Sequence, residues 1–171
     1  MKYHPSRRLC RYTGTCLAAM LPHWFDTYDW DLVIPIPSSI SQLRQRTFNQ
    51  CVLIARPIAH ALHLPLPLFA LSRTDRKAPQ ASLRHEQRPR NVLNAFTAAP
   101  RLVTGRRVLL VDDVITTGAT TAAAITALAK AGAESVDVVA AARAPAWLRY
   151  RSAVEARFPG TGLFPSSENV P

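Results

Sequence analysis

The segment 108–121 constrains the fold of this chain more than any other, because a short apolar run is followed by two acids and a loop rich in threonine and glycine. Its first four residues are Val or Leu, a composition typical of a strand buried on both faces of a parallel sheet. Asp112 and Asp113 follow where that strand would end, and the alanine-rich run 121–131 predicts a helix. Ligands of open α/β sheets bind beyond the carboxyl ends of strands, so the segment predicts a binding site.

The loop between the acids and the predicted helix has the chemistry of a phosphate site. It would present backbone N–H groups and hydroxyls at the positive end of a helix, which suits a phosphate monoester. Asp112 and Asp113 would repel a phosphate, but they can accept hydrogen bonds from ribose hydroxyls or hold Mg²⁺ through water, without binding a metal directly. The plainer alternative is a buried strand followed by a helix that a threonine caps, namely Thr117. The loop residues are Thr116, Thr117, Gly118, Ala119 and Thr120.

Two other classes of site with similar patterns are excluded by the sequence around the acids. In receiver domains the acidic pair lies near the start of the domain, and a phospho-accepting Asp follows on a later strand. Only four scattered acids follow Asp113 in this chain, and none of them stands at a second strand end. A Walker nucleotide-binding loop requires the pattern G-x-x-x-x-G-K-[ST], which the chain does not contain.

The chain is strongly basic and relies on arginine for its charge. Its net charge is +10, and the basic residues are 18 Arg and 3 Lys. Between Ser38 and Arg107 there are twelve basic residues against two acids. Arginine suits bidentate recognition of phosphate, so this region predicts a site for a polyanion such as pyrophosphate or nucleic acid. A solvated basic surface is the simpler alternative.

The cysteine and histidine residues give no pattern typical of a metal site. Three cysteines form no C-x-x-C pair, so no zinc site is predicted within the chain. An odd number of cysteines without a signal peptide indicates reduced thiols and a cytoplasmic location. His60 and His63 lack a third ligand nearby and are interpreted as surface or core-edge residues. The apolar runs are too short to span a membrane.

A second informative stretch, 31–39, begins with a buried strand that is predicted to end at Ile34. The two prolines that follow lack N–H groups, so they are expected to force a stiff loop at the carboxyl end of the strand. Ser38 offers a hydroxyl and an N–H group beside this loop, while Arg44 and Arg46 offer positive charge. A common strand-to-helix turn capped by serine is the alternative.

Apolar periodicity and proline positions predict the other elements. An amphipathic helix is expected over 6–21 and ended by Pro22, and a second over 48–63 and kinked by Pro57. The residues that predict the apolar face of the first helix are Leu9, Tyr12, Cys16, Leu17, Met20 and Leu21. The aromatic residues of 23–30 are interpreted as covering a core edge, with base stacking as the alternative. Also predicted are strands over 64–71 and 135–142, a helix end at Gly132, a flexible flap over about 73–91, and a loosely ordered tail over 144–171.

The segment 108–120 resembles the signature of type I phosphoribosyltransferases, enzymes that use phosphoribosyl pyrophosphate (PRPP). Two further stretches are similar to the V-P-V-P and R-x-R-G-F-N-Q motifs of the ComF/GntX family, namely Ile34-Pro35-Ile36-Pro37 and the run LRQRTFNQ at 43–50. Residues 79–83 and 88–96 are similar to its Q-x-x-L and R-x-N-V-x-x-A-F motifs. The likeness extends over about residues 2–143, and the combination of motifs carries it.

This resemblance implies a phosphoribosyltransferase-type three-layer α/β fold with a mostly parallel central sheet, in a domain of residues 1–143. It also implies that Asp112 and Asp113 meet the ribose hydroxyls of PRPP, that the loop 116–120 holds its 5′-phosphate, and that Mg²⁺ is the cofactor. Such a protein would be a phosphoribosyltransferase or an enzyme-like PRPP-binding protein. The residues implied for the pyrophosphate are Pro37, Ser38 and Arg44.

ComF relatives are associated with DNA uptake and natural competence, which implies an alternative from a different functional class. The Arg-rich region 44–107 would then contact single-stranded DNA or a helicase, and the fold would be a non-catalytic binding module. Two features depart from the family pattern. Thr47 stands where the family usually has Gly, and it would be strained if that Gly allows a positive φ, or would block a ligand if that Gly allows its close approach. The zinc ribbon of many relatives has no counterpart here, so a short form or an internal start is expected.

Overall fold

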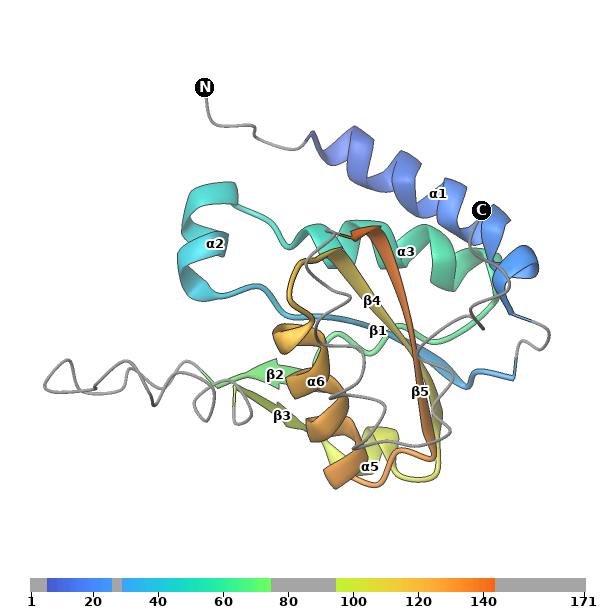
Figure 1. Cartoon of the computed structure of the whole chain (residues 1–171), viewed down its shortest axis with the longest axis vertical. Helices are drawn as coiled ribbons and strands as arrows, with labels where there is room; N and C mark the ends of the chain where they lie inside the picture. Colours follow the sequence, from blue (N-terminus) through green and yellow to red (C-terminus); the bar gives the residue numbers. More distant parts are fainter. Residues whose placement is uncertain (1–5, 26–28, 75–94, 144–171) are drawn as a thin grey trace, which may run out of the picture.

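A parallel sheet forms the centre of the protein, whose computed structural model describes residues 6–25, 29–74 and 95–143 (Figure 1). The strands are β1 (Leu32–Pro35), β4 (Arg107–Ile115) and β5 (Ser135–Arg143), in the spatial order β1-β4-β5. Both neighbouring pairs run parallel. Helices cover the two faces of this sheet, which confirms the predicted three-layer α/β fold with a parallel central sheet.

The side chains of the apolar run at the start of β4 alternate between two hydrophobic clusters, one on each face of the sheet. Val108 and Leu110 pack with α6 (Ala119–Lys130), whereas Leu109 and Val111 pack with α1 (Arg7–Trp24) and α3 (Gln50–Ala61). All four side chains are fully buried. A strand that is apolar at every position therefore becomes the central strand of a sheet covered on both sides.

A second, two-stranded sheet lies beside α6 and corrects one prediction. It pairs β2 (Leu71–Arg73) and β3 (Phe96–Ala98) antiparallel, and the short helix α5 (Pro100–Val103) follows. The prediction of a strand over 64–71 is wrong, because only residue 71 of that range belongs to a strand, β2. The chain before it is irregular because His63 turns it at a φ of 53° and its two prolines supply no N–H groups. Most of the predicted flap and the tail lie outside the described residues.

Helix α1 is longer than predicted and buries only part of its predicted apolar face, including Leu17 and Leu21. It continues through Pro22, because Phe25 N–H closes the last turn by donating to Leu21 at 3.1 Å. Its buried residues are Cys10, Gly14, Leu17 and Leu21. Three residues that contributed to the predicted apolar periodicity, Leu9, Tyr12 and Met20, are exposed instead. None of the helices within the described ranges combines the length and the apolar character needed to cross a membrane.

The other helix and strand ends lie close to the predicted ones. α3 spans Gln50–Ala61 with Pro57 inside it, where a helix over 48–63 was predicted. α6 begins two residues earlier than predicted, and Gly132 follows its end at a φ of 90°, as a residue that terminates a helix does. β1 extends one residue beyond its predicted end, because Ile36 N–H donates to Val111 of β4 at 2.9 Å and continues the pairing past the first proline.

Between β1 and α3 the chain forms α2 (Ile40–Arg46), a short helix with well-defined ends. Ser39 caps its start in a reciprocal capping box with Gln42. Thr47 ends it in the left-handed conformation at a φ of 61°. A threonine thus occupies a backbone conformation that glycine adopts at much lower cost, which confirms that this position requires a positive φ.

We expect Thr47→Gly to stabilise the protein by about 1 kcal/mol, because removing the Cβ relieves the left-handed strain. Urea denaturation of the two proteins measures this difference. The matched control is Thr47→Ala, which loses the same hydroxyl and its hydrogen bond to Arg46 but keeps the Cβ. Equal stability of the glycine and alanine variants would show that the φ angle carries no strain.

Candidate functional site

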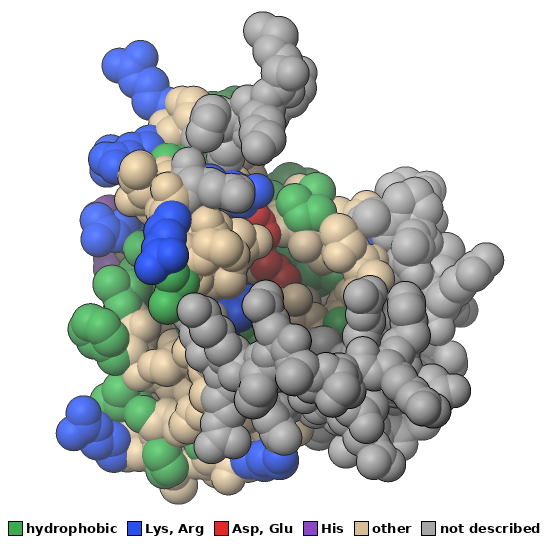
Figure 2. Space-filling model, turned by 90° about the vertical axis from the view of Figure 1, so that its left-hand side faces the viewer, with side chains coloured by type: hydrophobic (Ala, Val, Ile, Leu, Met, Phe, Trp, Pro, Cys, Tyr) green, Lys and Arg blue, Asp and Glu red, His purple; other side chains and the backbone are tan. Residues whose placement is uncertain are grey.

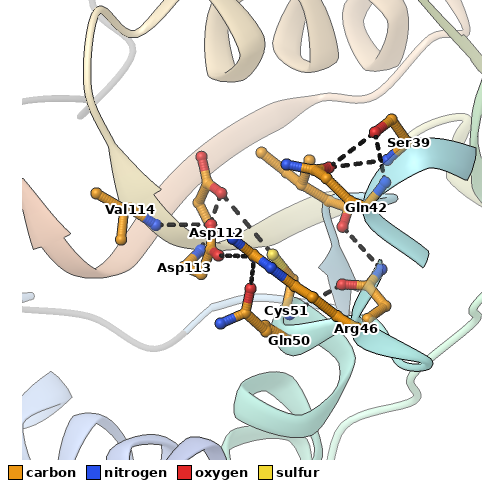
Figure 3. A network of polar contacts seen from close by, with 10 residues as sticks. Ser39, Gln42, Arg46, Gln50, Cys51, Asp112, Asp113 and Val114 are labelled. Carbon is orange, nitrogen blue, oxygen red and sulfur yellow. Dashed lines mark hydrogen bonds and ion pairs between the residues drawn. The ribbon is translucent and has the colours of Figure 1, made fainter. Parts of the chain in front are cut away.

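The carboxyl ends of β1 and β4 bring the two informative stretches of the sequence to one edge of the sheet. Pro35 pairs in register with Val111, so the loop after β1 starts beside the acids that follow Val111. Asn49, the N-cap of α3, donates to the carbonyl of Ile36 at 3.0 Å and holds the start of α3 against the end of β1. Figure 3 shows residues of α2, α3 and β4 converging here. On the side where α2 lies, acidic side chains sit in a recess bordered by basic and hydrophobic ones (Figure 2).

Asp112 is the buried member of the acidic pair, with 5% of its surface exposed. Its Oδ1 accepts from the N–H of Asp113 at 2.9 Å and from the thiol of Cys51 at 3.8 Å, and its Oδ2 accepts from the hydroxyl of Thr121 at 3.0 Å. Burial raises the pKa of Asp112 to about 6, and the charge of Asp113 adds to this effect. Three hydrogen bonds therefore hold the orientation of this carboxyl group.

Cys51 lies at the start of α3 and is buried against the acidic pair. Burial, together with the charges of Asp112 and Asp113, raises the pKa of its thiol well above the usual range. The thiol is therefore protonated at neutral pH and donates to Asp112. The same protonation makes it a poor nucleophile and a poor metal ligand.

Asp113 is the accessible member of the pair. Its Oδ1 accepts from the N–H of Val114 at 2.8 Å, and its Oδ2 lies 3.7 Å from Nη1 of Arg46. The side chains of Arg46 and Asp113 are 34% and 30% exposed, so a ligand can reach both of them. Arg46 also donates to the amide of Gln50, which links the end of α2 to the start of α3 (Figure 3).

The loop that was predicted to hold phosphate connects β4 to α6. Gly118 is the N-cap of α6 and has a φ of 75°, which a residue with a side chain adopts only with strain. Thr117 is therefore not the N-cap, although its hydroxyl accepts from the N–H of Ala119 at 3.4 Å. Thr116 and Thr117 are exposed, whereas Ala119 and Thr120 are half-buried. The loop thus combines a glycine turn, exposed hydroxyls and a helix N-terminus beside the acidic pair.

The residues predicted for pyrophosphate are less closely associated with the acidic pair. Pro37 and Ser38 are half-buried in the loop between β1 and α2, at the same sheet edge as Asp112. Arg44 is exposed, and it is Arg46, two residues later, that pairs with Asp113. Helical geometry explains the difference, because residues two apart on a helix point in different directions.

Sequence reasoning also missed Cys51 and gave no role to Thr121, the two side chains that bond to Asp112. Thr121 stands at the end of the segment that was singled out, and its position in the first turn of a helix after the loop was an available signal. Cys51 had none, because its contact with Asp112 spans 61 positions in the sequence and arises only when α3 packs on the sheet.

The side chains at this site fit a magnesium ion held mainly through water or ligand oxygens. Cys51, Asp112 and Asp113 offer possible ligand atoms within 4.8 Å of one another. Magnesium prefers oxygen ligands, which excludes the protonated thiol. Asp112 is buried and both of its oxygens accept hydrogen bonds from the protein, whereas the side chain of Asp113 is partly exposed, so Asp113 is the more accessible oxygen ligand.

Comparison with protein families identifies the domain. The family model described as "Phosphoribosyl transferase domain" matches residues 49–155. This range includes α3, the acidic pair and the loop before α6. The match extends over more than half of the chain.

Curated relatives agree with this assignment. The chain is 37% identical to DNA utilization protein YhgH of Shigella flexneri over 63% of this chain and 47% of that protein. It is 34% identical to Competence protein F of Haemophilus influenzae over 67% of this chain and 51% of the relative. The chain therefore spans about half the length of the curated relatives it matches.

The structure of purine phosphoribosyltransferase from Pyrococcus horikoshii is similar to this fold, with a TM-score of 0.51, 19% identity, and coverage of 84% of this chain and 79% of that one. The matched family model assigns the domain, and the named relatives link the chain to competence-related proteins with this fold. The chain therefore belongs to the phosphoribosyl transferase domain family and is a ComF-type member of it.

Proposed function

We propose that this protein binds PRPP at the recess formed by the acidic pair and the loop 116–120. The observation that carries the proposal is the placement of two carboxyl groups among the last four residues of β4, five and six positions before Gly118 and the N-terminus of α6. Carboxylates accept hydrogen bonds from ribose hydroxyls, and a helix N-terminus attracts a phosphate. The acceptors for the ribose hydroxyls and the site for the phosphate thus lie on one short segment of the chain, as the hydroxyls and the phosphate belong to one ribose 5-phosphate.

The two acids would have different roles. Asp113 is accessible and would accept hydrogen bonds from a ribose hydroxyl after exchanging its contact with Arg46. Asp112 is held by Thr121, Cys51 and the N–H of Asp113, so it would orient its neighbour, and it would accept from a ribose hydroxyl by exchanging one of these hydrogen bonds. The freed guanidinium of Arg46 would then be available for the pyrophosphate, together with Pro37, Ser38 and Arg44 from the same side of the sheet.

Magnesium would enter with the pyrophosphate and be held by Asp113 through water. When bound, Mg²⁺ neutralises the charge of the pyrophosphate and so makes it a better leaving group. The residues around it would position the ribose and stabilise the developing charges, since transfer from the C1 carbon requires no protein nucleophile. The high pKa of Cys51 agrees with this, because a protonated buried thiol is not poised for attack.

Single-stranded DNA or a helicase is the second candidate partner. Two relatives carry names that refer to DNA utilization and competence, and the net charge of this chain is +10. Several arginines of the described ranges are already engaged, since Arg46 and Arg107 form ion pairs and Arg73 stacks on Phe96. Exposed arginines remain at Arg44, Arg56, Arg101 and Arg106.

Asp113→Asn is expected to weaken PRPP binding about tenfold or more, because it removes a charged acceptor for a ribose hydroxyl. Calorimetric titration with Mg²⁺ present measures this change. Inorganic pyrophosphate titrated into the same variant without Mg²⁺ should bind equally well or more tightly, since a repulsive charge has been removed. The opposite responses of the two ligands separate contact with the ribose from general attraction of anions.

Glu134→Gln is the matched control, because it removes one negative charge just before the amino end of β5, at the end of the sheet opposite the acidic pair. It should leave the affinity for PRPP unchanged. If a folded wild-type protein binds no PRPP at millimolar concentration, the proposal fails, and the DNA or helicase interaction becomes the leading function.

A further inference from the structure

The guanidinium of Arg46 is directed at Asp113 by a third residue, Gln50. Nη1 of Arg46 lies 3.7 Å from Oδ2 of Asp113, and the same nitrogen donates to Oε1 of Gln50 (Figure 3). Arg46 is the last residue of α2, and Gln50 is the first residue of α3. The contact between these two helix ends therefore determines where the positive charge lies relative to the acid.

The backbone around this contact is fixed on both sides of Arg46. The N–H of Thr47 donates to the carbonyl of Leu43 at 2.8 Å and closes the end of α2. Asn49 caps α3 and donates to the carbonyl of Ile36 at 3.0 Å, which ties the connection between α2 and α3 to the end of β1. The guanidinium thus reaches the acid from an anchored backbone, so its position is a property of the fold.

A guanidinium beside Asp113 competes with a metal ion for that carboxylate. A dication that approaches Asp113 meets the positive charge of Arg46, and repulsion at about 5 Å lowers its affinity about fivefold to tenfold. The sequences of α1, α2 and α3 contain no acidic residue, so these helices supply no carboxylate that would offset the charge. A pyrophosphate group reverses this balance, because it accepts from a guanidinium through two oxygens and offers further oxygens to a metal.

We propose that Arg46 is a specificity-determining residue, which keeps Asp113 from binding a free divalent cation and leaves it when a ligand with a pyrophosphate group binds. This inference rests on the proposed binding of PRPP at the site. Arg46 then contacts the pyrophosphate, and Asp113 is released to the ribose and to water around the metal. Arg46 thereby couples entry of the metal to binding of PRPP, whereas ribose 5-phosphate, which lacks the pyrophosphate, gains nothing from Arg46.

Binding of Mn²⁺, which stands in for Mg²⁺, tests the first half of the proposal when no sugar phosphate is present. Electron paramagnetic resonance measures the free and bound ion. Arg46→Gln should lower the dissociation constant for Mn²⁺ at least about fivefold, because it removes the positive charge beside Asp113. Gln50→Leu should lower it by a smaller factor, since it keeps every charge and removes only the acceptor that directs the guanidinium.

Lys130→Gln is the control for a general effect of charge. It removes one positive charge at the exposed far end of α6 and should leave the dissociation constant for Mn²⁺ unchanged. An unchanged affinity for Mn²⁺ in Arg46→Gln, or an equal gain in Lys130→Gln, would overturn the proposal.

Calorimetric titrations of PRPP and of ribose 5-phosphate, both with Mg²⁺, test the second half. Arg46→Gln should weaken PRPP binding about tenfold or more, because a charge-assisted contact with the pyrophosphate is lost, and should change the affinity for ribose 5-phosphate by less than about threefold. Equal losses for the two ligands would contradict the proposed selection. A wild-type protein that binds no PRPP contradicts the proposed function as well as this second half, whereas the Mn²⁺ measurements decide separately whether Arg46 keeps the cation from Asp113.

Discussion

Replacing Gly14 by alanine is expected to destabilise the protein by at least ~3 kcal/mol. Gly14 lies on the buried face of α1, where a Cβ would lie 2.2 Å from the carbonyl oxygen of Ile54 in α3. The nearest atoms are all backbone atoms of Ile54, so no side-chain rotation can make room. Helix α1 would have to move away from α3, and the cluster that contains Leu17, Leu21 and Ile58 would lose its packing.

This expected loss is opposite in sign to the effect of helix propensity. Alanine in the middle of an exposed helix is favoured over glycine by about 1 kcal/mol, so propensity alone predicts that Gly14→Ala stabilises. Urea denaturation of both proteins decides between the two effects. Thr15→Ala is the control at the next, exposed position and should change the free energy of unfolding by less than ~0.5 kcal/mol. Unchanged or increased stability of Gly14→Ala would contradict the close packing of α1 on α3.

The wild-type protein is expected to lose about 2 to 3 kcal/mol of stability through Asp112 as the pH rises from about 4 to about 7. The pKa of Asp112 is raised to about 6 in the folded protein, mainly by burial, from an ordinary value near 3.8. The folded state therefore binds this proton more tightly than the unfolded state does. The stabilisation is complete below the unfolded pKa, decreases as the pH passes through the folded pKa, and is absent above it.

Asp112→Asn removes this dependence, because asparagine does not ionise. The difference in unfolding free energy between the variant and the wild type should therefore shift in favour of the variant between pH 4 and pH 7. Taking this difference separates Asp112 from other groups, such as Asp31, whose pKa is lowered because it accepts from the N–H of Arg107. Urea denaturation across this range measures the shift, and Glu134→Gln is the exposed control. A difference that stays constant with pH would show that Asp112 ionises normally.

The central strand and the position of the candidate site could be predicted from the sequence because both depend on local composition. Four consecutive apolar residues require burial on both faces, and β4 is indeed the middle strand of the sheet. The acids follow that run directly, so they were predicted at the end of the strand, and they lie near it, although β4 continues through both acids to Ile115. The helix after the loop also followed from local propensity, with its start two residues from the predicted one.

The buried face of α1 could not be read from the sequence, because the helix is apolar around most of its circumference. The predicted apolar periodicity combined Leu17 and Leu21, which are buried, with residues such as Leu9 and Tyr12, which are exposed. The choice depends on Gly14, which permits a close approach to α3 that no larger residue would allow. A contact between two helices is a property of the pair, and neither helix contains it alone.

The sequence by itself determined the α/β order of elements, the two acids at the end of β4 and the glycine turn before α6. Only the tertiary structure decided that Asp112 is buried with a raised pKa while Asp113 remains accessible beside Arg46. The physical reason is that desolvation and charge pairing depend on atoms brought in from α2 and α3, more than sixty positions away along the chain. Adjacent residues of one type thus acquired different chemistry from their surroundings.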